Sequence, residues 1–213
     1  MEFESVEKNI SRQLLKVKAV TLSLDNPYTW ASGWKSPIYC DNRKLLSYPD
    51  IRRAVCDAFV KIIENKYKDQ VDYIAGVATG GIPYGIMVAE KLNKPFVYVR
   101  PKPKDHGLNA QIEGDLERGS KVVLVEDLIS TGSSSLSAAD CIAKSGSIVL
   151  GMVAIFSYNF SSARRAFEYA NVEMRTLSNY DALLDEAIAE KYIKESDLEV
   201  LKQWRISPDK WGK

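Results

Sequence analysis

The chain has 213 residues, of which 46% are hydrophobic and 27% are charged, and 29 Lys and Arg residues against 28 Asp and Glu residues leave a net charge of +1. A chain of this size buries about 70% of the surface that its unfolded form exposes, enough for a full core without disulfides or a structural metal. Its apolar content is too high for a disordered chain, and its balanced charge argues against a broadly basic surface for nucleic acid or a membrane.

The N-terminus is acidic and has neither the basic residues nor the apolar block of a secretory signal. The longest apolar run, residues 148–156, is much shorter than the roughly 20 residues of a membrane-spanning helix. Cys40, Cys56 and Cys141 are odd in number and form no CxxC pair, which favours reduced thiols over a disulfide framework or a zinc site. We therefore expect a cytoplasmic protein.

Two helices are expected in the first part of the chain. Apolar residues recur at helical spacing over the first twenty positions, and a second apolar stripe follows Pro49, a residue favoured in the first turn of a helix. Between them, residues 28–43 are dense in aromatic, turn-forming and hydrogen-bonding residues. This segment fits either a hairpin-like cover packed on the core or a hood over a planar ligand, and periodicity does not decide between the two.

From residue 71 onward, short apolar runs alternate with helical stretches. Strands are expected at residues 71–77, 95–99, 122–125, 148–156 and 172–177, and helices at residues 83–92 and in the stretch that ends at Gly146. Strands that are apolar on both faces and alternate with helices indicate a parallel sheet covered on both sides. Right-handed crossovers then give an α/β fold with a doubly wound, mainly parallel sheet flanked by helices.

Residues 180–204 are expected to form two more helices, and Ser196-Asp197-Leu198-Glu199 fits a capping box at the start of the second. The sequence has no repeat, linker or low-complexity tract. We therefore expect a single domain over residues 1–213, with an N-terminal helix and small hood at 1–45 and a C-terminal helical extension at 178–213.

The strongest chemical signal is residues 121–134, KVVLVEDLISTGSS. Glu126 and Asp127 follow a buried strand, and ligands of open α/β sheets bind at the carboxyl ends of the strands. The next residues bear hydroxyls or are glycine, and a helix follows whose free N–H groups suit a phosphate. Because carboxylates accept hydrogen bonds from sugar hydroxyls, the pattern predicts a ribose 5-phosphate site. The alternative is a strand-to-helix turn whose acids only stabilise the helix N-terminus.

Two further segments point to anions. Residues 99–114 gather Arg100, Lys102, Lys104 and His106, the only histidine, in a stretch whose prolines and glycines predict a long loop. Such loops often close over sites, and a basic one suits a polyanionic substrate or leaving group, although a charge run alone is usually a solvated face. Residues 76–83, GVATGGIP, place a Gly-Gly turn after a strand, which can offer backbone amides to an anion or serve only as a tight turn.

Together these segments resemble the orotate phosphoribosyltransferase family over roughly residues 25–160. The paired carboxylates and the hydroxyl loop resemble type I phosphoribosyltransferases, which bind phosphoribosyl pyrophosphate. The Lys-Asp-His-Gly loop and the segment SGWKSPIYCDNR are more specific, because they resemble the orotate enzyme. The resemblance implies Mg²⁺-dependent transfer of ribose 5-phosphate from phosphoribosyl pyrophosphate to orotate, which gives orotidine 5'-phosphate and pyrophosphate. It also implies a homodimer with shared active sites.

The resemblance also implies roles for individual residues. Lys104, His106 and Asp127 are expected to be catalytic, and Ser130 is expected to contact orotate as well as the ribose phosphate. Mg²⁺ is expected to be held mainly by substrate oxygens and not directly by protein side chains. The residues expected to bind phosphoribosyl pyrophosphate are Arg100, Lys104, His106, Glu126, Asp127, Leu128, Ile129, Ser130, Thr131, Gly132, Ser133 and Ser134.

The chain departs from the best-known family pattern at Ala31, Gly80, Pro101 and Tyr158, and none of these positions is assigned to the site. Two other functions stay open on the sequence alone. One is a phosphoribosyltransferase for another base. The other is a regulator that keeps the fold and contacts nucleic acid, for which a basic face or an added helix-turn-helix domain would be expected.

Overall fold

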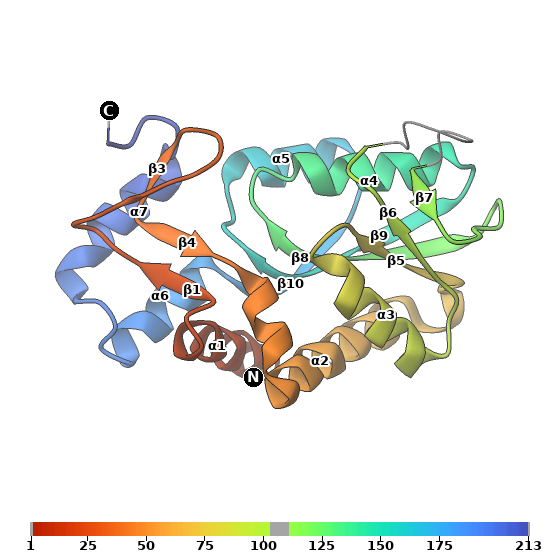
Figure 1. Cartoon of the computed structure of the whole chain (residues 1–213), viewed down its shortest axis with the longest axis horizontal. Helices are drawn as coiled ribbons and strands as arrows, with labels where there is room; N and C mark the ends of the chain where they lie inside the picture. Colours follow the sequence, from red (N-terminus) through yellow and green to blue (C-terminus); the bar gives the residue numbers. More distant parts are fainter. Residues whose placement is uncertain (1, 103–110, 213) are drawn as a thin grey trace.

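The computed structural model describes residues 2–102 and 111–212 (Figure 1). Its centre is a six-stranded sheet in the order β10-β9-β8-β5-β6-β7, in which every pair is parallel except β6 with β7. This confirms the expected doubly wound, mainly parallel α/β fold. The strands are β5 (Tyr73–Val77), β6 (Phe96–Val99), β7 (Ile112–Glu113), β8 (Lys121–Ile129), β9 (Ile148–Ser157) and β10 (Met174–Asn179).

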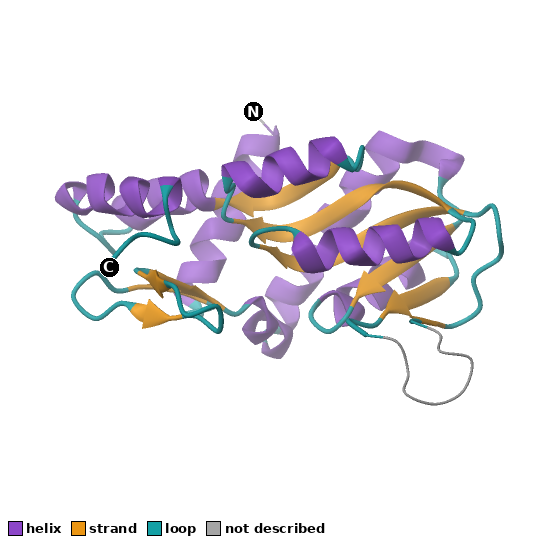
Figure 2. Ribbon diagram, turned by 90° about the horizontal axis from the view of Figure 1, so that it is seen from above, coloured by secondary structure: helices purple, strands orange, loops and turns teal. Residues whose placement is uncertain are grey.

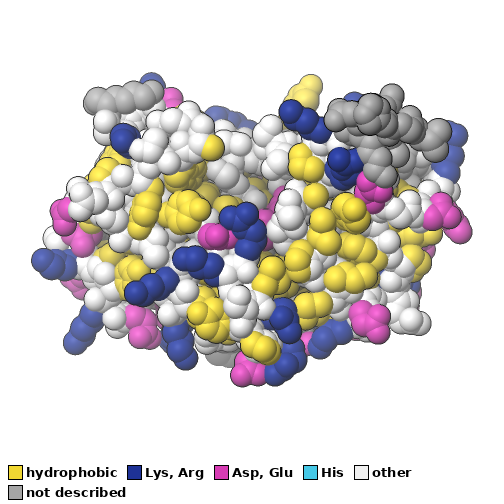
Figure 3. All heavy atoms as spheres, in the orientation of Figure 1, with side chains coloured by type: hydrophobic (Ala, Val, Ile, Leu, Met, Phe, Trp, Pro, Cys, Tyr) yellow, Lys and Arg dark blue, Asp and Glu magenta, His cyan; other side chains and the backbone are white. Residues whose placement is uncertain are grey.

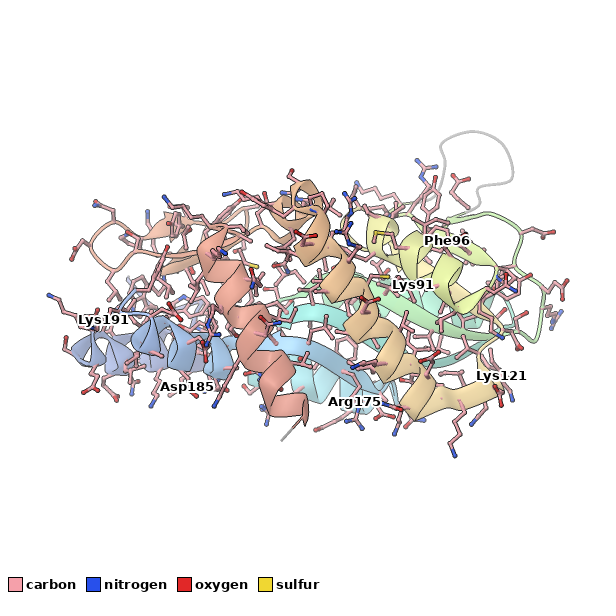
Figure 4. All side chains as sticks on the ribbon, turned by 90° about the horizontal axis from the view of Figure 1, so that it is seen from below. Lys91, Phe96, Lys121, Arg175, Asp185 and Lys191 are labelled. Carbon is pink, nitrogen blue, oxygen red and sulfur yellow. The ribbon has the colours of Figure 1, made fainter. Side chains whose placement is uncertain are left out.

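Helices cover both faces of the sheet. One face carries α1 (Glu2–Lys16), α2 (Pro49–Tyr67) and α3 (Gly81–Leu92), which lie side by side in the view from below (Figure 4). The opposite face carries α4 (Ser133–Lys144) and α5 (Ser161–Tyr169), in front of the sheet in the view from above (Figure 2). The strands between them are apolar on both sides, because the residues from Val122 to Val125 are all fully buried.

The expected hood is a pair of small two-stranded sheets. β1 (Val20–Leu22) pairs with β4 (Ile38–Cys40), and β2 (Tyr28–Thr29) pairs with β3 (Lys35–Ser36), both antiparallel. The hood continues into a 3₁₀ helix, η1 (Asn42–Ser47), that leads to α2.

An aromatic cluster joins the hood to the C-terminal part of the chain. The ring of Trp30 lies 5.1 Å from Tyr158, 6.4 Å from Phe160 and 5.7 Å from Trp204, measured between centroids. Trp204 is fully buried and donates a hydrogen bond from Nε1 to the Lys35 carbonyl oxygen at 3.2 Å. Residues 28–43 therefore form a hairpin-like cover that packs on the core through Trp30, but their aromatic side chains are only partly buried, and Tyr39 is 43% exposed.

The C-terminal helices are α6 (Tyr180–Ala189) and α7 (Leu198–Ile206), as expected, but the capping box is wrong. A short 3₁₀ helix, η3 (Glu195–Asp197), precedes α7, and the Asp197 carboxylate accepts a hydrogen bond from the Lys194 amide at 2.9 Å. Glu199 instead accepts a hydrogen bond from Gln203 along the helix. The polar residues therefore cap the turn before α7. None of the described helices is long and apolar enough to cross a membrane.

Strand β8 extends to Ile129, four residues beyond its expected end at Val125. The reason is asymmetric pairing: the ladder with β5 ends at Val125 opposite Gly76, while the ladder with β9 continues to Ile129 opposite Ser157. Glu126 and Asp127 therefore belong to the strand but lie where one neighbouring strand has already ended. The open side of β8 at these two residues is where the candidate site forms.

Candidate functional site

A pocket of about 380 Å³ lies at the carboxyl ends of β5 and β8. Three parts of the chain form it: the turn from β5 to α3, the end of β8 with the loop to α4, and the last residues of the hood. This is where ligands bind in open α/β sheets. The lining residues are Cys40, Asp41, Arg43, Ala78, Thr79, Gly80, Glu126, Asp127, Leu128, Ser130, Thr131, Gly132 and Ser134.

Most of the predicted ribose-phosphate segment lines this pocket. Ser133 lines a neighbouring pocket instead, and Ile129 is fully buried in the core, so its side chain lies in neither. Gly132 adopts a left-handed conformation with φ of +83° directly before α4, which is unstrained only for glycine. The loop thus passes directly into a helix N-terminus, whose unpaired amides favour an anion.

The two carboxylates differ in what they can reach. Glu126 is 4% exposed; its Oε1 accepts the Asp127 amide and its Oε2 accepts the Ser135 hydroxyl, each at 3.0 Å. Burial raises the pKa of Glu126 well above its usual range, and the nearby charge of Asp127 raises it further. Asp127 is partly exposed at the pocket wall. The Asp127 carboxylate is therefore the one that is open to the pocket, while both oxygens of Glu126 hold the strand end.

Gly80 makes room for the Asp127 carboxylate. A Cβ atom on Gly80 would collide with all three carboxyl atoms of Asp127, although the backbone at Gly80 has an ordinary helical conformation with φ of −69°. Gly81 packs equally closely on the backbone of Val125, and the Ala78–Thr79 peptide bond in this turn is cis. Both glycines are thus explained by close approach of the turn to β8 and not by backbone freedom.

The hood contributes residues that the sequence did not identify as site residues. The Asn42 side chain is fully buried and donates a hydrogen bond to the Asp127 carbonyl oxygen at 2.6 Å, which ties the hood to β8. Arg43 Nε donates to Asp41 Oδ1 at 2.6 Å, and this bond lowers the pKa of Asp41. Burial and the charge of Asp127 raise the pKa of the Cys40 thiol, which therefore stays neutral. The sequence feature that could have indicated these site residues is the polar run Asp41-Asn42-Arg43, which directly follows the last strand of the hood.

A second pocket of about 450 Å³ adjoins the first and contains Arg100. The two pockets share Ala78, Thr131 and Ser134. Arg100 Nη1 lies 3.6 Å from Glu113 Oε1. The lining residues are Val77, Ala78, Val99, Arg100, Pro101, Gln111, Thr131, Ser133, Ser134, Ser137 and Ala138.

Strands β6 and β7 bring the ends of the basic loop together beside this second pocket. The Arg100 amide donates to the Gln111 carbonyl at 2.9 Å, and the Gln111 side chain donates back to the Arg100 carbonyl at 2.7 Å. The predicted residues Lys104 and His106 lie outside the described residues. Among the described residues on the face seen in Figure 3, Lys and Arg side chains are interspersed with Asp and Glu and form no broad basic patch.

The donor set suits a cation that is carried by a substrate. Over residues 2–102 and 111–212, no group of three or more His, Cys, Asp or Glu side chains is placed to hold a metal ion. Mg²⁺ usually takes one or two carboxylates and completes its six oxygen ligands with substrate phosphates and water. The partly exposed Asp127 carboxylate can supply such a contact, whereas both oxygens of Glu126 already accept hydrogen bonds.

The chain is similar in sequence and in structure to known proteins. Residues 41–186 match the family model of the phosphoribosyl transferase domain. The chain is 55% identical to the orotate phosphoribosyltransferase of Phocaeicola vulgatus, and the match covers 98% of each chain. It is similar in structure to the orotate phosphoribosyltransferase of Aeropyrum pernix, with a TM-score of 0.74, 27% identity and coverage of 87% of this chain and 99% of that one. The UMP synthase of Leishmania donovani is similar over 95% of this chain but only 43% of its own, with a TM-score of 0.79 and 25% identity.

Proposed function

Because this chain belongs to the orotate phosphoribosyltransferase family, we propose that the two adjoining pockets at the carboxyl ends of β5, β6 and β8 are its active site. The enzyme transfers a ribose 5-phosphate group from phosphoribosyl pyrophosphate to orotate, producing orotidine 5'-phosphate and pyrophosphate for pyrimidine nucleotide (UMP) synthesis. The observation that carries the location of the site is the meeting of Asp127 with the hydroxyl loop at the N-terminus of α4.

The ribose 5-phosphate is assigned to the wall shared by the two pockets. The 5'-phosphate would accept hydrogen bonds from the hydroxyls of Ser130, Thr131 and Ser134 and from the free amides of α4. Asp127 would accept hydrogen bonds from the ribose hydroxyls. Its negative charge would also stabilise the positive charge that develops on the sugar as the bond to pyrophosphate breaks.

Glu126 is assigned to holding Asp127 in place. Its oxygens accept the Asp127 amide and the Ser135 hydroxyl, so its buried carboxyl supports the strand end from inside. The direct contact between Glu126 and the ribose stays a prediction. Leu128 would complete the wall, whereas Ile129 would act only through its backbone and its place in the core.

Pyrophosphate is assigned to the second pocket, where Arg100 would contact it. Lys104 and His106 would complete this cationic environment, and their roles stay predictions. Bound Mg²⁺ would neutralise the charge of the leaving pyrophosphate, held mainly by substrate oxygens with Asp127 nearby. We also propose a cytoplasmic homodimer in which the basic loop of one subunit serves the site of the other.

Pyrophosphate release with a panel of bases tests the function. Purified enzyme is given phosphoribosyl pyrophosphate, Mg²⁺ and, in turn, orotate, uracil, hypoxanthine or xanthine. We expect release with orotate only, and its loss when Mg²⁺ is removed with a chelator. Release with a purine but not with orotate would contradict the proposal, and the variant Asp127→Asn serves as a site-directed negative control.

A further inference from the structure

Two arginines line different pockets, and these pockets share the wall assigned to ribose 5-phosphate. Arg100 lines only the second pocket and Arg43 lines only the first, while Ala78, Thr131 and Ser134 line both. A displacement at the anomeric carbon brings in the base on one side and expels pyrophosphate on the other. If Arg100 faces the pyrophosphate, Arg43 is on the side where the base must enter.

Arg43 is oriented so that part of its guanidinium stays available. Its Nε donates to Asp41 Oδ1 at 2.6 Å, whereas Nη1 and Nη2 form no hydrogen bond or ion pair with the described residues. The side chain of Arg43 is 59% exposed and that of Asp41 is 19% exposed. Asn42, between them, is bonded to the carbonyl of Asp127, so the position of Arg43 is fixed relative to the ribose strand.

Among the described residues that line the first pocket, Arg43 is the cation that can meet an anionic base. The other ionisable residues that line the first pocket are Cys40, Asp41, Glu126 and Asp127, and none of them can carry a positive charge. Without a cation, a base that carries a carboxylate would be repelled from this wall. Gly80 and Tyr158 are two of the positions at which the chain departs from the family pattern, and neither supplies a positive charge. Gly80 has no side chain, and Tyr158 is 2% exposed within the aromatic cluster.

We propose that Arg43 binds the carboxylate of orotate through its two Nη groups and thereby selects orotate over bases without a carboxylate. A guanidinium matches a carboxylate in a planar, two-bond geometry that lysine cannot reproduce. Asp41 is the positioning residue, because its bond to Nε fixes one edge of the guanidinium and leaves both Nη groups to bind a ligand. This inference rests on the proposed function and adds to it the residue that recognises the base.

Kinetics of Arg43→Met and Arg43→Lys test the inference. We expect the KM for orotate to rise about 10- to 100-fold in Arg43→Met, and less in Arg43→Lys, because a charged hydrogen-bonded pair is lost. The KM for phosphoribosyl pyrophosphate should change by less than about threefold, since its phosphates lie on the other side. Arg53→Met is the matched control: Arg53 has the same 59% exposure and pairs with the nearby carboxylate of Asp50, but it lies on α2 outside both pockets.

Product binding gives a second readout that does not depend on turnover. Wild-type enzyme should bind orotidine 5'-phosphate more tightly than UMP, which is the same nucleotide without the carboxylate. In Arg43→Met this preference should disappear, while the affinity for UMP stays the same. Circular dichroism and the melting temperature establish that each variant is folded, and Arg43→Lys replaces Arg43→Met if the latter is not.

The outcomes separate this inference from the function on which it rests. If wild-type enzyme releases no pyrophosphate with orotate, the proposed function fails. If wild-type enzyme is active and Arg43→Met keeps its KM for orotate and its preference for orotidine 5'-phosphate, only the role of Arg43 is overturned. An equal rise in the KM for both substrates would also overturn it, because Arg43 would then serve the phosphates or the fold.

Discussion

Asp127 and Gly80 depend on one another at the scale of single residues. The carboxyl group of Asp127 occupies the space that any side chain at position 80 would need. Because the backbone of Gly80 is in an ordinary helical conformation, alanine could adopt it without strain, and the three atoms nearest to its Cβ would all belong to the Asp127 side chain. A substitution at this position therefore tests the placement of Asp127 without removing its charge.

We predict that Gly80→Ala lowers kcat/KM about 10- to 100-fold, because it displaces the carboxylate that faces the ribose. The measurement is steady-state kinetics with phosphoribosyl pyrophosphate as the varied substrate. Gly119→Ala is the control: its φ of +86° costs about 1 kcal/mol of stability when the residue is alanine, but nothing lies within 4 Å of the added Cβ, so activity should be retained. Equal activity in both variants would refute the coupling.

Glu126 should make the stability of the enzyme depend on pH. Burial raises its pKa in the folded state above the ordinary value of 4.5, so the folded protein keeps a proton that the unfolded chain releases. The contribution of this bound proton to the free energy of unfolding is complete below pH 4.5 and is lost as the pH rises through the folded-state pKa of Glu126. Glutamine can accept the Asp127 amide and donate to Ser135 without any ionisation.

We therefore predict that the melting temperature of Glu126→Gln, relative to wild type, increases as the pH is raised from about 4.5 toward neutrality. Thermal unfolding in a series of buffers measures this difference. The control is Glu199→Gln, the same substitution at an exposed glutamate on α7, which measures any general effect of replacing glutamate by glutamine. A constant difference for Glu126→Gln would show that burial does not shift its protonation.

At the scale of elements, the aromatic cluster holds the hood against the C-terminal helix. Trp204 packs against Trp30, Tyr158, Phe160 and Tyr180, with ring centroids 5.5–5.8 Å apart. We predict that Trp204→Ala destabilises the protein by about 3–5 kcal/mol, because it removes a large buried side chain and leaves a cavity. Urea unfolding measures the change. Tyr169→Ala, which removes an aromatic ring that is 95% exposed, should change stability by less than about 0.5 kcal/mol.

The elements that the sequence predicted are those with strong periodicity. The core strands and the helices α2, α3 and α4 lie close to their expected positions, because each has an apolar stripe or run that tertiary packing reinforces. Helix α5 was missed because only Ala163 and Phe167 of its nine residues are buried. Strand β7 was missed because it is two residues long and exists only through its pairing with β6.

The lining of the candidate site was predictable where one continuous segment forms it. Residues 126–134 combine acids, hydroxyls and glycine, and most of them line the first pocket. The contribution of Asp41 and Arg43 was not predictable, because it depends on how the hood folds back over β8 through the Asn42 bond to Asp127. Likewise, local sequence does not reveal that Gly80 is required by a carboxylate 47 positions later.

At the scale of the whole molecule, the proposed homodimer predicts complementation between two inactive variants. Lys104→Ala and Asp127→Asn would each impair the reaction, the first in the basic loop and the second at the ribose wall. If the loop of one subunit serves the other, mixed dimers contain one intact site and one doubly defective site. Random mixing in equal amounts should then restore about one quarter of wild-type activity.

The measurement is pyrophosphate release after the two variants are unfolded, mixed and refolded together. Each variant refolded alone is the control, and size-exclusion chromatography determines whether dimers form. Recovery of no activity by a folded dimeric mixture would contradict shared sites. It would leave the assignment of Asp127 intact, because that residue is tested by its own kinetics.

The hood packs against α7, which is the last helix of the chain, and this has a consequence for folding during synthesis. Trp30 packs on Trp204, and the Lys35 carbonyl accepts a hydrogen bond from the same residue. Helix α1 also contacts residues late in the chain, because Ser11 is hydrogen-bonded to Ser178 and Arg12 to Glu186. On the ribosome, the strands from β5 to β9 can pair as they emerge, but the hood that carries Arg43 lacks its contacts with Trp204 until α7 has been translated. The nascent enzyme should therefore acquire its ribose-phosphate cradle first and its capacity to discriminate among bases last.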